Sequence, residues 1–326
     1  MEDDDGISYF YRGNVENTVK FGEYTKDYYV YRCEYQTANS DEVSTIDFAS
    51  LEECQYYASE SNTRSACTED NKVLKYSAGT PMYWKIIRVN GDKSIRMIYF
   101  GTTPDGTDSA IIASTAYNRE SNDIKYTGYT YDRDATEVDS RIKLTIDNWY
   151  NNFLKDTIYD DKIILGKFCN DTSGYQEDSF ISEEGGYSFA AFRRNFANVY
   201  GTGDNSSPSF KCPATTETFG GNYNLKVGLM TLDETVASGS QFALNESTYL
   251  FNTEVFFTMS ASKVSIGAWT VGPAADISRA GYGFTGLSGG DYGLEDAEGL
   301  RPVINLTSDV TFTKTTEEGI TVYTVN

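Results

Sequence analysis

Hydrophobic and polar positions alternate most clearly between residues 81 and 103. The run YWKIIRV is followed by the turn sequence NGDK and then by a second strand-like run, IRMIYF. An Asn-Gly pair between two such runs is a strong signal for a β-hairpin, because both residues tolerate positive φ. The sequence therefore predicts an antiparallel hairpin over 81–103. Its basic residues are expected on the solvated side, with an anion-binding site as the alternative; they are Lys85, Arg88, Lys93 and Arg96.

Three segments carry signals for helices. Residues 139–155 place apolar side chains at helical spacing, with Asp139 or Ser140 as the N-cap. The apolar positions of that segment are Ile142, Ile146, Trp149, Tyr150 and Phe153. A shorter helix is expected over residues 189–201, and Thr231 with Glu234 forms a T-x-x-E capping box that begins a third helix.

Further strand-like segments cover residues 254–262, 267–278, 300–314 and 319–326, separated by Gly and Asp turns. Together these elements predict an α+β fold with a mostly antiparallel sheet and two or three flanking helices. Residues 280–299 differ from the rest because they contain seven glycines and almost no β-branched residue. A long Gly-rich loop in a compact domain favours a binding or lid role.

Charge and the absence of histidine limit the function. The chain has 48 acidic and 27 basic residues and a net charge of -21, which argues against binding to nucleic acid or to an anionic membrane surface. It contains no histidine, which excludes Ser-His-Asp and Cys-His hydrolases and zinc sites that need His. Chemistry based on carboxylate pairs or on lysine remains open.

The opening residues MEDDDGISYF carry neither a basic nor an apolar targeting region, and we expect that an N-terminal signal or anchor has been removed. The five cysteines have no C-x-x-C spacing, so disulfides are the expected use, with one thiol left free or paired between chains. Many tyrosines, an acidic pI and disulfides are typical of exported bacterial proteins. The expected location is extracellular or at the cell surface.

A series of short motifs resembles a group of exported Gram-positive bacterial surface proteins of unassigned function. The motifs occur in the same order over nearly the whole chain: YFYRGNVENTVKFG, YWKIIRVNGDKSIRMIY, DNWYNNFL, KFCNDTS, FKCP, VGLMTLDETV, FFTMSAS and GLRPVINLTSDVT. In that group the first two motifs are nearly contiguous. The resemblance therefore implies that residues 23–81 are an inserted subdomain within a single domain formed by residues 1–22 and 82–326.

The resemblance also bears on the cysteines. The inserted segment carries Cys33, Cys54 and Cys67, and we expect one disulfide to pin it, without knowing which of the three is unpaired. That leaves Cys169 to pair with Cys212 across a loop of about 43 residues, a bridge that would stabilise the fold by a few kcal/mol.

Residues 222–326 are similar, more distantly, to the C-type lectin-like fold of formylglycine-generating enzymes and of the variable proteins of diversity-generating retroelements. This implies a core strand over residues 257–260, a last core strand over residues 299–303, and a structural role for Arg301. The chain has no cysteine after Cys212, so the enzyme activity is not implied. In the variable proteins, ligands contact the segment that corresponds to residues 263–298.

The expected ligand-binding residues combine rigid aromatic rings with charges that fix orientation. They are Trp269, Asp276, Arg279, Tyr282, Phe284, Asp291, Tyr292, Glu295 and Asp296, and Trp269 has a core position as its alternative. A calcium site is the one cofactor hypothesis, because residues 131–139 carry hard oxygen ligands, although a solvated acidic loop is the simpler interpretation. Those candidate ligands are Asp132, Asp134, Glu137 and Asp139.

These observations predict a non-enzymatic adhesion protein that binds an extracellular protein or carbohydrate through its Gly-rich and aromatic C-terminal surface. It would meet a membrane only through a removed N-terminal anchor. A pilin-like or cell-wall-layer subunit is the alternative, in which the unpaired cysteine or an exposed edge strand makes subunit contacts. A glycan hydrolase that depends on two carboxylates is a third hypothesis.

Overall fold

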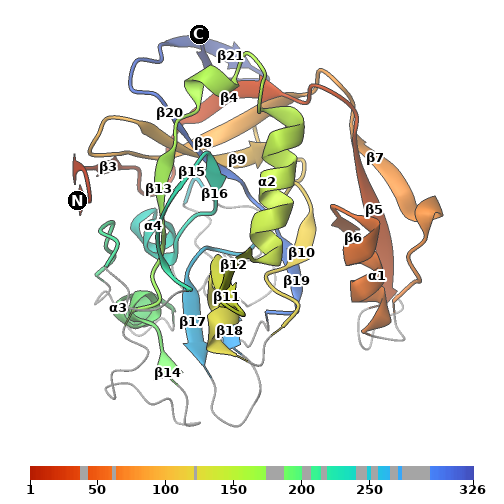
Figure 1. The fold of residues 1–326 in the computed structure, drawn as a ribbon. Coiled ribbons are helices and arrows are strands. Elements are labelled where there is room, and N and C mark those ends of the chain that lie inside the picture. The colour runs from red at the N-terminus through yellow and green to blue at the C-terminus, as the bar shows by residue number, and fades with distance from the viewer. Residues whose placement is uncertain are drawn as a thin grey trace.

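The chain folds as an α+β protein in which antiparallel sheets predominate, as the sequence predicts (Figure 1). The computed structural model describes residues 1–36, 43–60, 64–120, 123–173, 187–199, 207–213, 219–239, 248–250, 256–264, 271–273 and 294–326. The α-helices in these ranges are α1 (Leu51–Ser59), α2 (Arg141–Phe153), α3 (Ala190–Val199) and α4 (Leu232–Ala237). Three of these were expected from the sequence, and α1 was not.

The largest sheet joins strands from both ends of the chain. In spatial order it contains β16 (Val227–Gly228), β20 (Val303–Leu306), β9 (Ile95–Gly101), β8 (Pro81–Val89), β4 (Thr18–Glu23), β22 (Ile320–Val325) and β21 (Phe312–Glu317). The short β3 (Tyr9–Phe10) also pairs with β8. Neighbours run antiparallel except β4 and β22, which are parallel. The middle of this sheet supports most of the hydrophobic core.

Strands β8 and β9 form the predicted hairpin, but its turn works differently from the expectation. The residue with positive φ is Lys93, at 73°, and Gly91 does not have positive φ. Gly91 instead allows the backbone of the N-terminal residues to approach, because a Cβ at this position would overlap Gly6 N and lie 2.6 Å from the carbonyl carbon of Asp5. The glycine is therefore needed for close packing of residues 1–8.

Helix α2 packs its apolar face on the main sheet, as the spacing predicts. Ser140 is its N-cap, and the Ser140 hydroxyl accepts a hydrogen bond from the backbone of Lys143. The buried ring of Trp149 meets Tyr99 of β9 edge to face at 6.0 Å between centroids. The helix is thus held by aromatic burial, which contributes the largest apolar area per residue.

Helix α4 begins at the predicted capping box. Thr231 accepts a hydrogen bond from the backbone N–H of Glu234, and the Glu234 carboxylate accepts one from the N–H of Thr231. Gly239 follows the helix with φ of 100°, a conformation that favours glycine.

Neither of the two core strands implied by the lectin-like resemblance has the expected bounds. Residues 257–260 are buried but form no strand; their backbone contacts Gly299 and Met230 instead. Residues 299–303 are the junction between β19 (Ala297–Gly299) and β20. Pro302 explains the interruption, because proline cannot donate to a sheet ladder. Arg301 is fully buried and donates to the carbonyls of Tyr99 and Leu250, which agrees with its expected structural role.

The segment 23–81 contributes most of a second sheet, whose order is β19, β10 (Ser114–Ala116), β6 (Val43–Phe48), β5 (Tyr28–Gln36) and β7 (Lys72–Tyr76). A single register pair, Ser114 with Phe48, joins β10 to β6. With α1, strands β5, β6 and β7 form a lobe at the right of Figure 1, which we call the inserted lobe after the predicted insertion. The domain division taken from the resemblance remains a prediction, but this narrow connection is compatible with it.

Four further small strand groups lie within the part of the chain that the structure describes. They pair β1 (Glu2–Asp3) with β2 (Gly6–Ile7), β11 (Thr130–Arg133) with β12 (Thr136–Asp139), β13 (Gly166–Asn170) with β15 (Gly221–Leu225), and β17 (Ala261–Val264) with both β14 (Tyr187–Ser188) and β18 (Val271–Pro273). Three short 3-10 helices lie at Glu69–Asn71, Ile124–Thr127 and Asp160–Lys162.

Two disulfides are present, and one of them confirms the predicted pair Cys169 and Cys212. The other joins Cys54 to Cys67 within the inserted segment, so Cys33 is the free thiol, and it is buried. No helix among the described residues has the length and apolar character needed to cross a membrane.

Candidate functional site

Most of the predicted ligand surface lies outside the described residues. This applies to Trp269, Asp276, Arg279, Tyr282, Phe284, Asp291 and Tyr292. Glu295 and Asp296 are described, and both are exposed just before β19. Burial raises the pKa of Tyr56 on α1, and the Glu295 carboxylate raises it further. The C-terminal end of the predicted surface therefore borders the inserted lobe.

The calcium candidates lie on the β11–β12 hairpin and do not converge. Asp132 and Glu137 face each other across the hairpin, and Asp134 lies in its turn with φ of 54°. The Asp139 carboxylate accepts a hydrogen bond from Lys143 Nζ at 3.0 Å, so a cation already neutralises it. Within the described ranges, cysteines rather than these acids form the set of metal-ligating atoms that lie close together. On this hairpin Asp134 and Glu137 are exposed, whereas Asp132 and Asp139 are half-buried.

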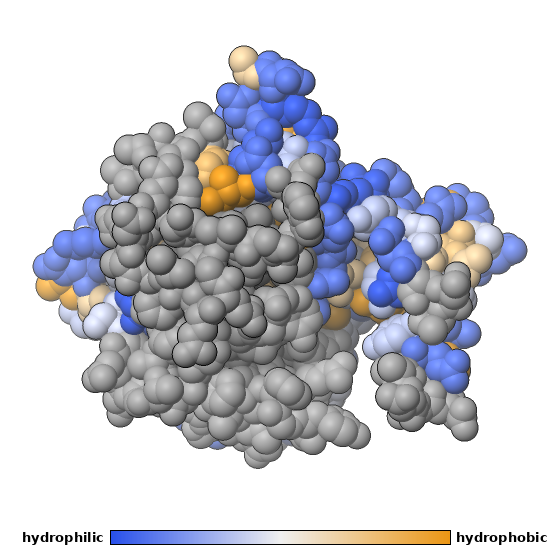
Figure 2. Space-filling model, turned by 90° about the horizontal axis from the view of Figure 1, so that it is seen from below, coloured by the Kyte–Doolittle hydropathy of each residue, from blue (hydrophilic) through white to orange (hydrophobic). Residues whose placement is uncertain are grey.

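A cleft of about 370 Å³ separates the inserted lobe from α2. Seen from below, the lobe stands apart from the rest of the molecule, and its described surface is mostly hydrophilic (Figure 2). The cleft is lined by Lys26, Asp27, Tyr28, Tyr29, Ala49, Ser50, Glu52, Glu53, Ile112, Arg141, Leu144, Thr145, Asn148, Trp149, Asn152 and Phe153. The lining residues thus come partly from the inserted segment and partly from the chain that follows it.

The floor of the cleft is aromatic, and its rim combines exposed apolar groups with amides. Tyr28, Trp149 and Phe153 are buried, and the rings of Tyr28 and Phe153 meet edge to face at 5.1 Å. At the rim, Tyr29 is 42% exposed and Leu144 is 41% exposed. Small-molecule sites typically combine apolar walls with a few well-placed polar groups, and this cleft has that composition.

The amides of the rim come from one stripe of α2. Leu144, Asn148 and Asn152 are exposed and follow one another at four-residue spacing, so they share a helix face opposite the core. Lys26 Nζ donates to Asn152 Oδ1 at 2.7 Å, and the same ammonium lies over the Phe153 ring. Asn152 Nδ2 in turn donates to the Asn148 carbonyl at 2.8 Å, so the protein itself holds the Asn152 amide in place between Lys26 and α2.

Charged residues fasten α1 beside the cleft. Glu53 is buried, and its carboxylate accepts hydrogen bonds from Arg119 at 2.8 Å, from the Thr115 hydroxyl at 3.0 Å, and from Arg141. Glu52 accepts a hydrogen bond from Arg119 and forms an ion pair with Arg141 at 2.9 Å. Hydrogen bonds from Arg141 and Arg119 lower the pKa of Glu52, which makes it a poor proton donor. These carboxylates hold the lobe in place.

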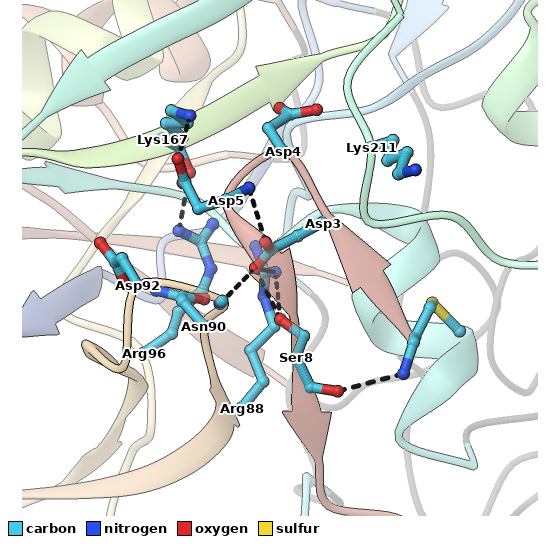
Figure 3. A network of polar contacts seen from close by, with 12 residues as sticks. Asp3, Asp4, Asp5, Ser8, Arg88, Asn90, Asp92, Arg96, Lys167 and Lys211 are labelled. Atoms are coloured by element: carbon cyan, nitrogen blue, oxygen red, sulfur yellow. Dashed lines mark hydrogen bonds and ion pairs between the residues drawn. The ribbon is translucent and has the colours of Figure 1, made fainter.

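A second, smaller pocket of about 140 Å³ lies beneath the N-terminal residues, where Asp3 reaches into the protein (Figure 3). Asp3 Oδ2 accepts hydrogen bonds from Ser8 Oγ at 2.6 Å, Gly91 N at 2.8 Å and Arg88 Nη1 at 3.0 Å. Burial opposes ionisation, but the hydrogen bonds from Ser8 and Gly91 outweigh it and lower the pKa of Asp3. The chain thus places its own carboxylate in this pocket.

The basic hairpin residues are mainly buried here, so the expectation that they face solvent was wrong for Lys85, Arg88 and Arg96. Arg88 and Arg96 can be buried because both pair with Glu234, whose Oε1 lies 3.0 Å from Arg88 Nε and 2.6 Å from Arg96 Nε. Burial opposes ionisation of Glu234, but the two guanidinium groups lower its pKa. Burial lowers the pKa of Arg96 to about 10, against the attraction of Glu234. The result is an internal charge network.

The acidic residues around Asp3 are matched by nearby donors. Asp5 pairs with Lys167 at 2.5 Å, and Glu2 pairs with Lys211 at 2.6 Å. The Asp4 carboxylate accepts a hydrogen bond from Asn222 Nδ2 at 3.0 Å. Because side chains of the chain itself already pair with many of the charges in this smaller pocket, the cleft beside α2 is the stronger candidate for a ligand site.

Comparison with known proteins adds no assignment. No protein-family model matches the chain, and neither the curated proteins nor the solved structures give a match. The lectin-like resemblance therefore stays a prediction, and the cleft must be interpreted from its own chemistry.

Proposed function

We propose that this protein is a non-enzymatic extracellular protein that binds a carbohydrate, with the cleft between the inserted lobe and α2 as part of the binding surface. The observation that carries the proposal is the composition of the cleft: an aromatic floor, the exposed ring of Tyr29, and the amides of Asn148 and Asn152. Sugar rings offer apolar faces and many hydroxyls, which such a mixture of rings and amides complements.

An extracellular location is supported by the two disulfides, which persist in oxidising compartments. A binding role, rather than hydrolysis, is supported by the carboxylates at the cleft. Hydrolysis of a glycoside needs one carboxyl group that stays protonated near neutral pH. Glu52 is held ionised by Arg119 and Arg141, and Glu53 accepts hydrogen bonds from the same two arginines.

The predicted loop surface belongs to the same proposal. Glu295 borders α1, which also carries the cleft residues Glu52 and Glu53. A ligand longer than one sugar unit could therefore contact the cleft, the lobe and the exposed residues Glu295 and Asp296 together. This would make the inserted segment and the C-terminal loop one recognition surface.

The test is a glycan array probed with the full chain and with the Tyr29→Ala/Asn148→Ala variant. We expect at least about tenfold weaker binding, since truncating a tyrosine that carries binding energy costs about 2 kcal/mol or more and about 1.4 kcal/mol corresponds to tenfold. Tyr9→Ala is the matched control, because Tyr9 is 64% exposed and is not among the residues that line the cleft. Unchanged binding by the double variant would remove the cleft from the proposal.

A second variant separates the cleft from the loop. If Trp269→Ala/Tyr282→Ala/Tyr292→Ala abolishes binding while the cleft variant binds normally, the ligand contacts the loop alone. If neither variant changes binding to any glycan or host protein that the wild type recognises, the assignment of this surface is wrong.

A structural subunit is the alternative, and one observation favours it. Strand β21 is at the edge of the main sheet, and most of its residues are exposed. An exposed edge can pair with another chain. Cys33 is fully buried, so the expected contact through the unpaired cysteine is not supported. Light scattering that shows concentration-dependent growth of long assemblies would favour this alternative over ligand binding.

A further inference from the structure

Three cysteines from separate elements meet inside the inserted lobe. Cys33 belongs to β5, Cys54 to α1, and Cys67 to the connection before the 3-10 helix Glu69–Asn71. Their Sγ atoms all lie within 4.8 Å of one another, and all three residues are buried. Cys54 and Cys67 are bridged, whereas Cys33 carries a free thiol. The third sulfur is thus packed directly against a disulfide.

The surroundings hold these sulfurs in place. Phe48 and Tyr57 pack around them, with ring centroids 5.0 Å apart. The Cys33 thiol donates to the carbonyl of Ser65 at 3.4 Å, and the Ser65 hydroxyl lies 3.8 Å from Cys33 Sγ and donates to it. A hydroxyl oxygen is therefore present beside the Cys33 sulfur.

We propose that reduction of the Cys54–Cys67 bridge converts this cluster into a binding site for one thiophilic divalent cation, such as Zn²⁺ or Cd²⁺, held by three cysteine thiolates. A Zn–S distance of about 2.3 Å in tetrahedral geometry places sulfurs about 3.8 Å apart. Cys33 Sγ lies no more than 4.8 Å from either sulfur of the bridge, about 1 Å beyond that spacing at most, and the two bonded sulfurs would move apart to it after reduction. The Ser65 hydroxyl or a water molecule would complete the fourth position.

The conversion is chemically balanced. A dithiol reductant transfers two electrons and two protons to the Cys54–Cys67 bond, gives two thiols, and itself becomes a disulfide. Binding of the cation then releases the protons of three thiols, because thiolates are the ligands. Soft sulfur ligands favour Zn²⁺, Cd²⁺ and similar ions over Ca²⁺ and Mg²⁺, which prefer oxygen.

The site would give the lobe two alternative cross-links, a disulfide or a bound cation. In the oxidised protein the disulfide ties α1 to the connection that follows it, and in the reduced protein the cation would tie the same helix to that connection and to β5. Because α1 carries Glu52 and Glu53 at the cleft, the state of this cluster would bear on the shape of the cleft. This effect on the cleft would be the same whichever molecule binds in the cleft.

The experiment uses the full chain, reduced with a phosphine that is then removed without oxygen. Cd²⁺ is titrated into the protein, thiolate-to-metal charge transfer is followed in the ultraviolet, and a chelator competition gives the dissociation constant. We expect one tightly bound ion per chain in the reduced protein and none in the oxidised protein. Equal binding by the oxidised protein would overturn the proposal.

Three variants assign the site. Cys33→Ser should weaken binding at least about 100-fold, since even loss of an outer-shell partner costs 10–100-fold. Ser65→Ala disturbs the same packing but keeps all three thiols, and a water molecule can take the fourth position, so its affinity should fall clearly less than that of Cys33→Ser. Cys169→Ser/Cys212→Ser removes the other reducible pair and should bind as the wild type does. If Cys33→Ser keeps wild-type affinity, the cluster is not the binding site, whatever the stability of the variants.

Discussion

Replacing Glu234 with glutamine would leave two buried guanidinium groups without the carboxylate that lies between them. Glu234 is 2% exposed, Arg96 is 1% exposed and Arg88 is 7% exposed, so solvent cannot compensate either cation. Asp3 would remain as a partner of Arg88 at 3.0 Å. Arg96 would lose its ion pair with Glu234 and retain contacts that carry no full charge, such as the carbonyl of Lys167.

The expected loss is about 3–5 kcal/mol, the usual cost of removing one partner from a buried ion pair. For a chain of 326 residues, an unfolding entropy of about 2.1 cal/mol/K per residue gives a total of about 0.7 kcal/mol/K. The melting temperature should therefore fall by about 4–7 °C. The capping hydrogen bond to Thr231 can survive in glutamine, so the loss is mainly electrostatic.

The pH dependence supplies an independent signature. The folded-state pKa of Glu234 lies below its unfolded value, so its contribution is complete above the unfolded pKa of about 4.3. That contribution is lost as pH falls through the folded-state pKa. The wild type should lose stability over this acidic range more steeply than Glu234→Gln, and the two melting temperatures should converge at low pH.

The assay is thermal unfolding followed by circular dichroism at neutral pH and at several acidic pH values. Glu2→Gln is the matched control, because Glu2 belongs to the same N-terminal segment but forms an exposed pair with Lys211. This control should leave the melting temperature unchanged. A Glu234→Gln protein that melts within about 1 °C of the wild type, at every pH, would refute the reasoning about the buried network.

Three more outcomes are expected. Burial lowers the pKa of Lys85 from 10.5 to about 8, so the unfolded state binds more protons than the folded state between these pH values, and the stability of the wild type should rise with pH there. Lys85→Met should flatten this pH dependence and raise the free energy of unfolding at pH 7 by up to about 3 kcal/mol, as measured by denaturant unfolding. Gly91→Ala should push residues 3–6 away and break the hydrogen bond from the backbone N–H of residue 91 to Asp3. Hydrogen exchange of that N–H, followed by mass spectrometry, should become at least about tenfold faster. Cys169→Ser/Cys212→Ser should lower the melting temperature by about 6 °C, because closing a 43-residue loop contributes about 4 kcal/mol; an unchanged value in either thermal or exchange measurement would contradict the corresponding argument.

Local signals in the sequence predicted the local structure well. The β8–β9 hairpin, α2 with its Ser140 cap, and the capping box at Thr231 were all predicted correctly, because each depends on residues a few positions apart. The Cys169–Cys212 bridge was predicted as well, because the expected insertion claimed the other three cysteines.

Features that depend on distant residues were missed. The surroundings of Arg88 depend on Glu234, which is 146 positions away, and alternation within the hairpin cannot show that a carboxylate arrives from α4. The cleft likewise combines Tyr29 with Asn148, which are far apart in the sequence and come together only in the folded protein. The stripe of Leu144, Asn148 and Asn152 was visible at helical spacing, but the sequence could not show that the inserted lobe faces it.

The parallel pairing of β4 with β22 has a consequence for how the molecule is made. Strand β4 begins at Thr18 and pairs there with Val322 of β22, 304 positions further along the sequence. A ribosome that synthesises the chain from its N-terminus releases β22 long after β4. This part of the large sheet can therefore form only after all the residues between the two strands have been made.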